Sequence, residues 1–194
     1  MDITSYLLGK NSAGGGGGGI DWNAIGYSTT PQCITEGYNR AKEIYDNWNS
    51  ATIIVDNAFV DDKTLIFAPL INTSNATSMK STFKNCTSLI EVPLIDTSNV
   101  LYCTTMFSGC TALKKIPKFN FSRLTGAYNM FLNCGNLEDE SLDNLLQSCA
   151  GATSYVDTKT ISYMGIAKKY YSAEKIQALP HYQDFIDAGW TIGY

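Results

Sequence analysis

The sequence predicts an α/β solenoid, a short array of 24-residue units with a helical cap at each end. The main observation is a repeat between Thr73 and Asp143, in which phenylalanine, cysteine and leucine return at the same interval. The three rows are Phe83, Phe107 and Phe131; Cys86, Cys110 and Cys134; and Leu89, Leu113 and Leu137. A fixed period of this length is typical of solenoids, in which each unit buries its apolar face by stacking on its neighbours.

Each unit is expected to contain a short helix followed by a short strand. A serine N-cap would start the helix, and a residue type that tolerates the left-handed conformation would end it, at Asn85, Gly109 and Asn133. Apolar residues then recur at every third position of the segment that follows. A proline interrupts each such segment and would keep the strands short, because proline cannot donate to a ladder; these are Pro69, Pro93 and Pro117.

The array is predicted to cover residues 51–167. Steps of one repeat length lead back to Phe59 and Leu65 in a diverged first unit, and they lead forward from Leu137 to a last strand at Ile161. The three cysteines in register are interpreted as reduced, buried thiols and not as disulfides, because they occupy one repeat position in a chain expected to be made in the cytosol.

The N-terminal residues are interpreted as an attachment device. Residues 1–10 would be an anchor peptide and residues 11–19 a flexible glycine-rich linker, because polyglycine has no side chain to pack. A frayed terminus is the alternative. The apolar groups of the anchor are Ile3, Tyr6, Leu7 and Leu8.

Helical segments are expected to cover both ends of the array, which would otherwise expose its core. Residues 20–50 contain one apolar stripe with helical spacing, formed by Ile34, Tyr38, Ala41, Tyr45 and Trp48. This stripe predicts an N-terminal cap, and a coiled-coil seam that would join a homotrimer is the alternative. Residues 168–194 are predicted to form the C-terminal cap, with Ser172 as an N-cap and Gly189 as a helix stop.

Composition and charge exclude several classes of partner. A net charge of −4 and a pI near 4.9 argue against nucleic acid as a partner, because phosphates demand a clustered basic surface. No apolar run is long enough to cross a bilayer, so no membrane insertion is expected. The N-terminus does not resemble a signal peptide, because Asp2 stands where a basic region is expected.

No catalytic constellation is visible in the sequence, and the chain is therefore predicted not to be an enzyme. The single histidine, His181, has no nucleophile or carboxylate partner nearby in the sequence. The acidic group Glu138, Asp139, Glu140 and Asp143 lacks the alternating spacing of a calcium loop and is better explained as charge at a helix N-terminus. Neither a metal nor a cofactor is predicted.

The predicted ligand-binding or partner-binding face consists of positions that would point outward from the strands. One end of this face is apolar and the other end is rich in lysine. Recognition surfaces of repeat proteins usually lie on such a face, although the N-terminal cap would be an alternative cover for half of it. The face comprises Ile66, Phe67, Leu70, Ile90, Glu91, Leu94, Lys114, Lys115 and Lys118.

The repeat resembles the leucine-rich repeats of BspA-like bacterial surface proteins, which also occur in prophages. The resemblance rests on the order N/G-C-x-x-L-x-x-[IV]-P, [DN]-T-S-N-[VA] and then M-F or T-F, and it covers Asn57 to Asp143. It departs in the fourth unit, where Phe121 and Arg123 replace residues of the T-S-N motif. The terminal motifs DWNAIGY and AGWTIGY also resemble phage virion proteins that carry such repeats.

The resemblance implies a binding protein with a leucine-rich-repeat-like array. The expected function is that of a non-enzymatic phage structural protein, a tail or head fibre or decoration, which is made in the host cytoplasm and carried on the virion. Residues 1–19 would attach it to other virion proteins, and the array would bind a host-surface protein or glycan. The alternative is an adhesin module on a bacterial cell surface.

Overall fold

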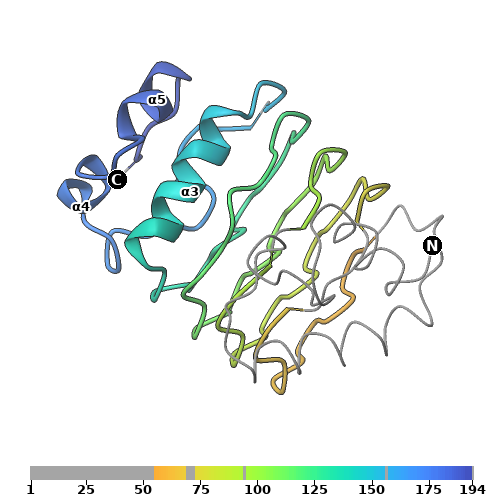
Figure 1. The fold of residues 1–194 in the computed structure, drawn as a ribbon. Coiled ribbons are helices and arrows are strands. Elements are labelled where there is room, and N and C mark those ends of the chain that lie inside the picture. Colours follow the sequence, from red (N-terminus) through yellow and green to blue (C-terminus); the bar gives the residue numbers. More distant parts are fainter. Residues whose placement is uncertain (1–54, 69–72, 94, 156, 194) are drawn as a thin grey trace, which may run out of the picture.

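The computed structural model describes residues 55–68, 73–93, 95–155 and 157–193. In this part of the chain, flat coils of about one repeat each lie side by side and are followed by three helices (Figure 1). The helices are α3 (Asp139–Ala150), α4 (Ala173–Gln177) and α5 (Tyr182–Asp187). We refer to residues 55–137 as the coil region and to residues 138–193 as the C-terminal region.

Backbone hydrogen bonds at a constant sequence interval hold the coils together. Alternate N–H groups of one coil donate to carbonyl oxygens of the next coil, and the intervening N–H groups donate to the third preceding residue of their own coil. The inter-coil bonds of one such row run from Met79, Ser81, Phe83 and Asn85 to Tyr102, Thr104, Met106 and Ser108, at 2.8 to 3.0 Å. The repeat length predicted from sequence therefore sets the register of the stack.

The predicted helices of the repeat units are wrong. No α-helix precedes α3 in the described residues, where the segments 80–85, 104–109 and 128–133 are successions of turns. The expected left-handed residues are confirmed, with φ of 61° at Asn85, 81° at Gly109 and 65° at Asn133. A second left-handed residue occurs four positions earlier in each coil, at Ser81, Thr105 and Asn129. This second left-handed residue interrupts the chain before the hydrogen-bonding pattern of a helix can repeat.

The predicted strands are also wrong, so the α/β solenoid class is overturned. The described residues contain isolated parallel bridges and no strand or sheet. One row joins Phe67, Glu91 and Lys115, and a second row joins Ser78, Tyr102 and Gly126. In the first row Pro93 has no N–H on one side of Glu91, while on the other side the Leu89 N–H donates to Cys86 of its own coil. This first row is therefore limited to one bridge between successive coils.

The core of the coil region consists of aligned rows of phenylalanine and cysteine. The rings of Phe59, Phe83, Phe107 and Phe131 stack with centroid separations of 5.1, 5.5 and 5.4 Å. The thiol of Cys110 donates to the Phe83 carbonyl oxygen one coil earlier, at 2.9 Å, and the thiols of Cys86 and Cys134 make the same contact in their coils. The five cysteines in the described residues are free thiols, as the sequence predicted for the three in register.

The C-terminal region departs from the constant step of the repeat. Helix α3 starts at Asp139, within the acidic group that the sequence places at a helix N-terminus, and it lengthens the chain before the next coil contact. In the coil region the Phe107 N–H donates to the Met130 carbonyl oxygen, but the Phe131 N–H donates to Met164, beyond the whole of α3. The predicted last strand near Ile161 is therefore absent, and only a single bridge joins Thr160 to Thr191.

Two helix signals in this region are confirmed. The Ser172 hydroxyl accepts a hydrogen bond from the Lys175 N–H at the start of α4, and Gly189 takes a φ of 82° after α5. Trp190 is buried and packs on the rings of Tyr155 and Phe185. No helix of the described residues has the length and apolarity that a membrane span requires.

Candidate functional site

A cavity of about 730 Å³ lies where the last coil of the repeat meets the C-terminal helices. The chain segment 118–121 forms one wall, α3 forms another, and the start of α5 completes it. The lining is mixed, with polar side chains and two buried phenylalanines. The lining residues are Lys118, Phe119, Asn120, Phe121, Gln147, Ala150, Gly151, His181 and Asp184.

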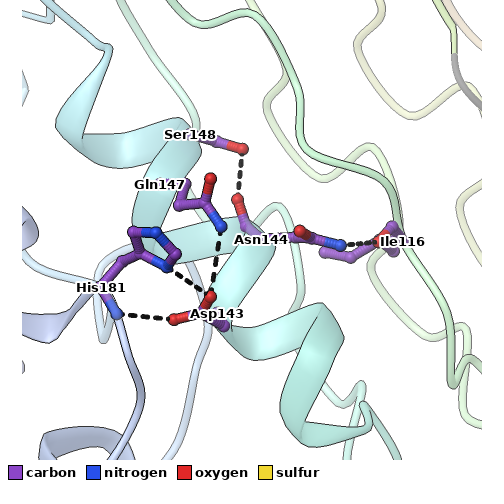
Figure 2. A network of polar contacts seen from close by, with 6 residues as sticks. All are labelled: Ile116, Asp143, Asn144, Gln147, Ser148 and His181. Carbon is purple, nitrogen blue, oxygen red and sulfur yellow. Dashed lines mark hydrogen bonds and ion pairs between the residues drawn. The ribbon is translucent and has the colours of Figure 1, made fainter.

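Buried Asp143 of α3 orients His181 at the edge of this cavity (Figure 2). One carboxylate oxygen accepts the His181 backbone N–H at 2.9 Å, and the other lies 2.6 Å from His181 Nδ1. Gln147 Nε2 donates to the same second oxygen at 3.2 Å. Because an ionised carboxylate only accepts, Nδ1 carries the proton in this arrangement. The other ring nitrogen makes no hydrogen bond to the described residues.

Serine hydroxyls of α3 hold the cavity wall in place by substituting for a missing coil. In the coil region, the Val92 N–H donates to the Lys115 carbonyl oxygen of the following coil. One repeat later, the Ile116 N–H donates instead to Ser141 Oγ at 3.0 Å. The Phe119 N–H similarly donates to Ser148 Oγ at 2.9 Å. These contacts satisfy buried N–H groups at the end of the stack, which would otherwise lack a partner.

Tyr171 pairs with backbone groups at the same end of the coil stack. Its hydroxyl donates to the Cys134 carbonyl oxygen at 2.7 Å and accepts from the Leu137 N–H at 2.8 Å. In the preceding coil, the equivalent N–H of Leu113 donates directly to Cys110. Burial is the main cause that raises the pKa of Tyr171, to about 12. The neutral hydroxyl is thus the form that this position requires.

The predicted ligand-binding face lies only partly in the described residues. Lys114, Lys115 and Lys118 are exposed, and Lys118 also lines the cavity. Glu91 is buried, with 7% of its surface exposed. Three apolar members are half-buried: Ile66, Phe67 and Ile90. Leu70 and Leu94 lie outside the described residues, as do the anchor residues Ile3, Tyr6, Leu7 and Leu8 and the proposed N-terminal cap 20–50.

The acidic group near the start of α3 is divided between two roles. Glu138, Asp139 and Glu140 are exposed, and Asp139 pairs with Lys175 at 2.6 Å. Asp143 faces His181 instead. No group of three or more metal-ligating side chains is found in the part of the chain that the structure describes.

Sequence reasoning missed the cavity because its members are distant in the chain. Asp143 and His181 are 38 residues apart and belong to different helical segments. The polar residues Ser141 and Ser148, seven positions apart on the otherwise apolar face of α3, were a visible signal that the helix covers backbone donors.

The comparisons with known proteins identify a family without assigning an activity. Residues 34–145 match the family described as Mycoplasma protein of unknown function, DUF285. This family is related to the BspA-like repeat proteins. No curated protein and no solved structure matches the chain. Because the family match spans more than half of the 194 residues, the chain belongs to the DUF285 family.

Proposed function

We propose that the chain is a non-enzymatic binding protein, carried on a phage virion as a fibre or decoration, which presents its coils to the host surface. One structural observation carries the binding role: a cavity lined by both polar and apolar groups adjoins the exposed lysines of the last coil of the repeat, and Lys118 belongs to both. Cavities with a few convergent polar groups are the usual form of a ligand site. The lysines would attract an acidic group of the ligand.

The chemistry of the cavity favours binding over catalysis. Its lining contains no serine, threonine or cysteine that His181 could activate as a nucleophile. The thiols are inert for a different reason, because burial raises the pKa of Cys103 and Cys134 to about 12 and keeps them protonated. The Asp143 carboxylate also bonds the His181 backbone, so the contact has a structural role in joining α3 to the start of α5.

The virion location is supported by features of the sequence. A short apolar peptide followed by a run of glycines suits a segment that docks into another virion protein and tethers the coils. The resemblance of the repeat to BspA-like repeats of phage proteins points in the same direction. An adhesin module on a bacterial cell surface is the alternative, because it would use the same coils with a different attachment.

Deletion of residues 2–19 tests the attachment. We expect the shortened chain to fold normally and to be lost from purified particles, which immunoblotting of virions would detect. Incorporation at the normal level would contradict attachment through this peptide. A chain found on the bacterial envelope in the absence of phage particles would favour the adhesin alternative.

Substitution of Lys114, Lys115 and Lys118 together by alanine tests the binding surface. We expect binding of the fluorescently labelled full chain to host cells to fall and to lose most of its dependence on salt, because exposed charges act through screened attraction. Replacement of three exposed lysines elsewhere, Lys63, Lys168 and Lys169, is the matched control. Equal losses in both variants would contradict a specific lysine surface.

A further inference from the structure

A second surface of the coil region carries two unusually exposed tyrosines. Tyr128 and Tyr102 have 47% and 42% of their surface exposed, the largest fractions among the large hydrophobic side chains of the described residues. Tyr128 packs on Tyr163 with ring centroids 4.9 Å apart and ring planes tilted by 55°. The three rings come from successive coils, so the hydrogen-bonded stack holds them at fixed spacing.

A carboxylate, Asp157, lies close to the Tyr102 ring and to Tyr163. A side chain at buried Gly126 would place its Cβ 3.0 Å from Asp157 Oδ2 and 3.7 Å from Tyr102 Cδ1, so the carboxylate and the Tyr102 ring both lie against this glycine. The Asp157 carboxylate accepts no hydrogen bond from the described residues. Partial burial, Asp157 and Tyr128 together raise the pKa of Tyr163, which is consistent with a carboxylate close to the tyrosine pair.

The charges around the rings select the type of ligand. Lys80 Nζ lies 4.5 Å from the centroid of the Tyr102 ring, so an ammonium group already occupies one face of that ring. A cationic ligand would be repelled by Lys80, and an anionic ligand would be repelled by Asp157. A neutral ligand with many hydroxyl groups avoids both penalties, because a hydroxyl can donate to the carboxylate and accept from the ammonium.

We propose that Tyr102, Tyr128 and Tyr163, together with Asp157, form a binding site for a neutral saccharide. A pyranose ring presents C–H groups on one face, which suit the electron-rich faces of exposed tyrosines, and hydroxyl groups around its edge, which suit Asp157 and Lys80. The inference rests on the proposed host-binding role and names a glycan as one ligand. The site shares no residue with the lysine surface or with the cavity.

Saturation-transfer NMR on the full chain tests this site with three neutral probes: methyl β-D-glucopyranoside, methyl β-D-galactopyranoside and N-acetylglucosamine. We expect at least one probe to bind, with the strongest signals on its ring C–H protons. Tyr128→Ala and Asp157→Asn should each weaken that binding about tenfold or more, which corresponds to roughly 1.4 kcal/mol. Both residues lie at the surface, so circular dichroism should show unchanged folding.

Tyr170→Ala is the matched control, because Tyr170 is 40% exposed and also carries a lysine, Lys169, 4.5 Å from its ring centroid. This variant should bind the probe like the unaltered chain. The proposal is overturned if none of the three probes binds, if the two site variants bind normally, or if tetramethylammonium binds in preference to every saccharide. Saccharide binding that survives the site variants would overturn this site alone and leave the proposed host-binding function standing.

Discussion

The coil region and the C-terminal region provide hydrogen-bond acceptors for buried backbone N–H groups by different means. In the turn segments of the coil region, alternate N–H groups donate to a carbonyl oxygen of the next coil at a constant step. In the C-terminal region the hydroxyls of Ser141, Ser148 and Tyr171 take the place of those missing backbone partners. A stack without strands or sheet can therefore propagate through its backbone, whereas ending it requires specific side chains.

Alkaline pH should have the largest effect, because it acts on both regions together. Burial raises the pKa of Cys134 from 9.0 to about 12 and that of Tyr171 from 10.0 to about 12. Both groups ionise more readily in the unfolded chain, so their stabilising contribution is complete below pH 9 and is lost as the pH rises towards about 12. Urea unfolding across this range should show a falling free energy of unfolding, and a constant value would contradict the burial of these groups.

Removal of one ring from the phenylalanine row should come next. Phe107 is fully buried and stacks on Phe83, Phe119 and Phe131, so Phe107→Ala should lower the free energy of unfolding by about 3–5 kcal/mol. Phe185 of α5 is equally buried but has two ring neighbours, both at 6.1 Å, whereas Phe107 has three, two of them at 5.4 and 5.5 Å. Chemical denaturation should therefore show a smaller loss for Phe185→Ala. The reverse order would mean that the C-terminal region, and not the coil region, dominates stability.

Asn85 and Gly109, which occupy equivalent positions with positive φ, allow a test of backbone conformation alone. A Cβ at Gly109 would clash with the Asn85 side chain, and its φ of 81° disfavours any residue with a side chain, so Gly109→Ala should cost about 1–3 kcal/mol. The opposite change, Asn85→Gly, keeps a φ of 61° available and loses only an exposed bond to Asp61. Thermal unfolding should show a clear loss for the first variant and little change for the second.

The smallest effect is expected at the contact between Asp143 and His181. The His181 side chain is 40% exposed, and its backbone N–H would still satisfy Asp143 in His181→Ala, so we expect a loss of about 1 kcal/mol or less. Asp143→Ala removes both contacts and should cost more. Equal and large losses from the two variants would show that the imidazole itself joins the helices.

The sequence could predict the period of the stack and the residues that fill it, but it could not predict its secondary structure. The phenylalanine and cysteine rows indicate burial, because the same residue recurs at the same position of every coil. Asn85 indicates a left-handed backbone, because asparagine tolerates a positive φ. Ser81 and Thr105 gave no such signal, because serine and threonine rarely adopt a positive φ. Their conformation follows from the inter-coil hydrogen bonds, which no local pattern records.

The candidate site was less predictable than the fold. Lys114, Lys115 and Lys118 were visible as a lysine-rich end of the repeat, because they lie within five consecutive residues of one unit. The pairing of Asp143 with His181 depends on how α3 and α5 pack on each other, and this packing is set by tertiary contacts beyond the repeat.

Amide hydrogen exchange in Ser141→Ala/Ser148→Ala tests most directly whether side chains end the stack in place of backbone. We expect the Ile116 and Phe119 amides, which donate to these two hydroxyls, to lose protection by about tenfold or more. The reason is that each unpaired buried donor costs about 1–3 kcal/mol. The Phe83 amide, which donates to the Met106 carbonyl oxygen inside the stack, should keep its protection. Unchanged protection at Ile116 and Phe119, or an equal loss at all three amides, would contradict the account.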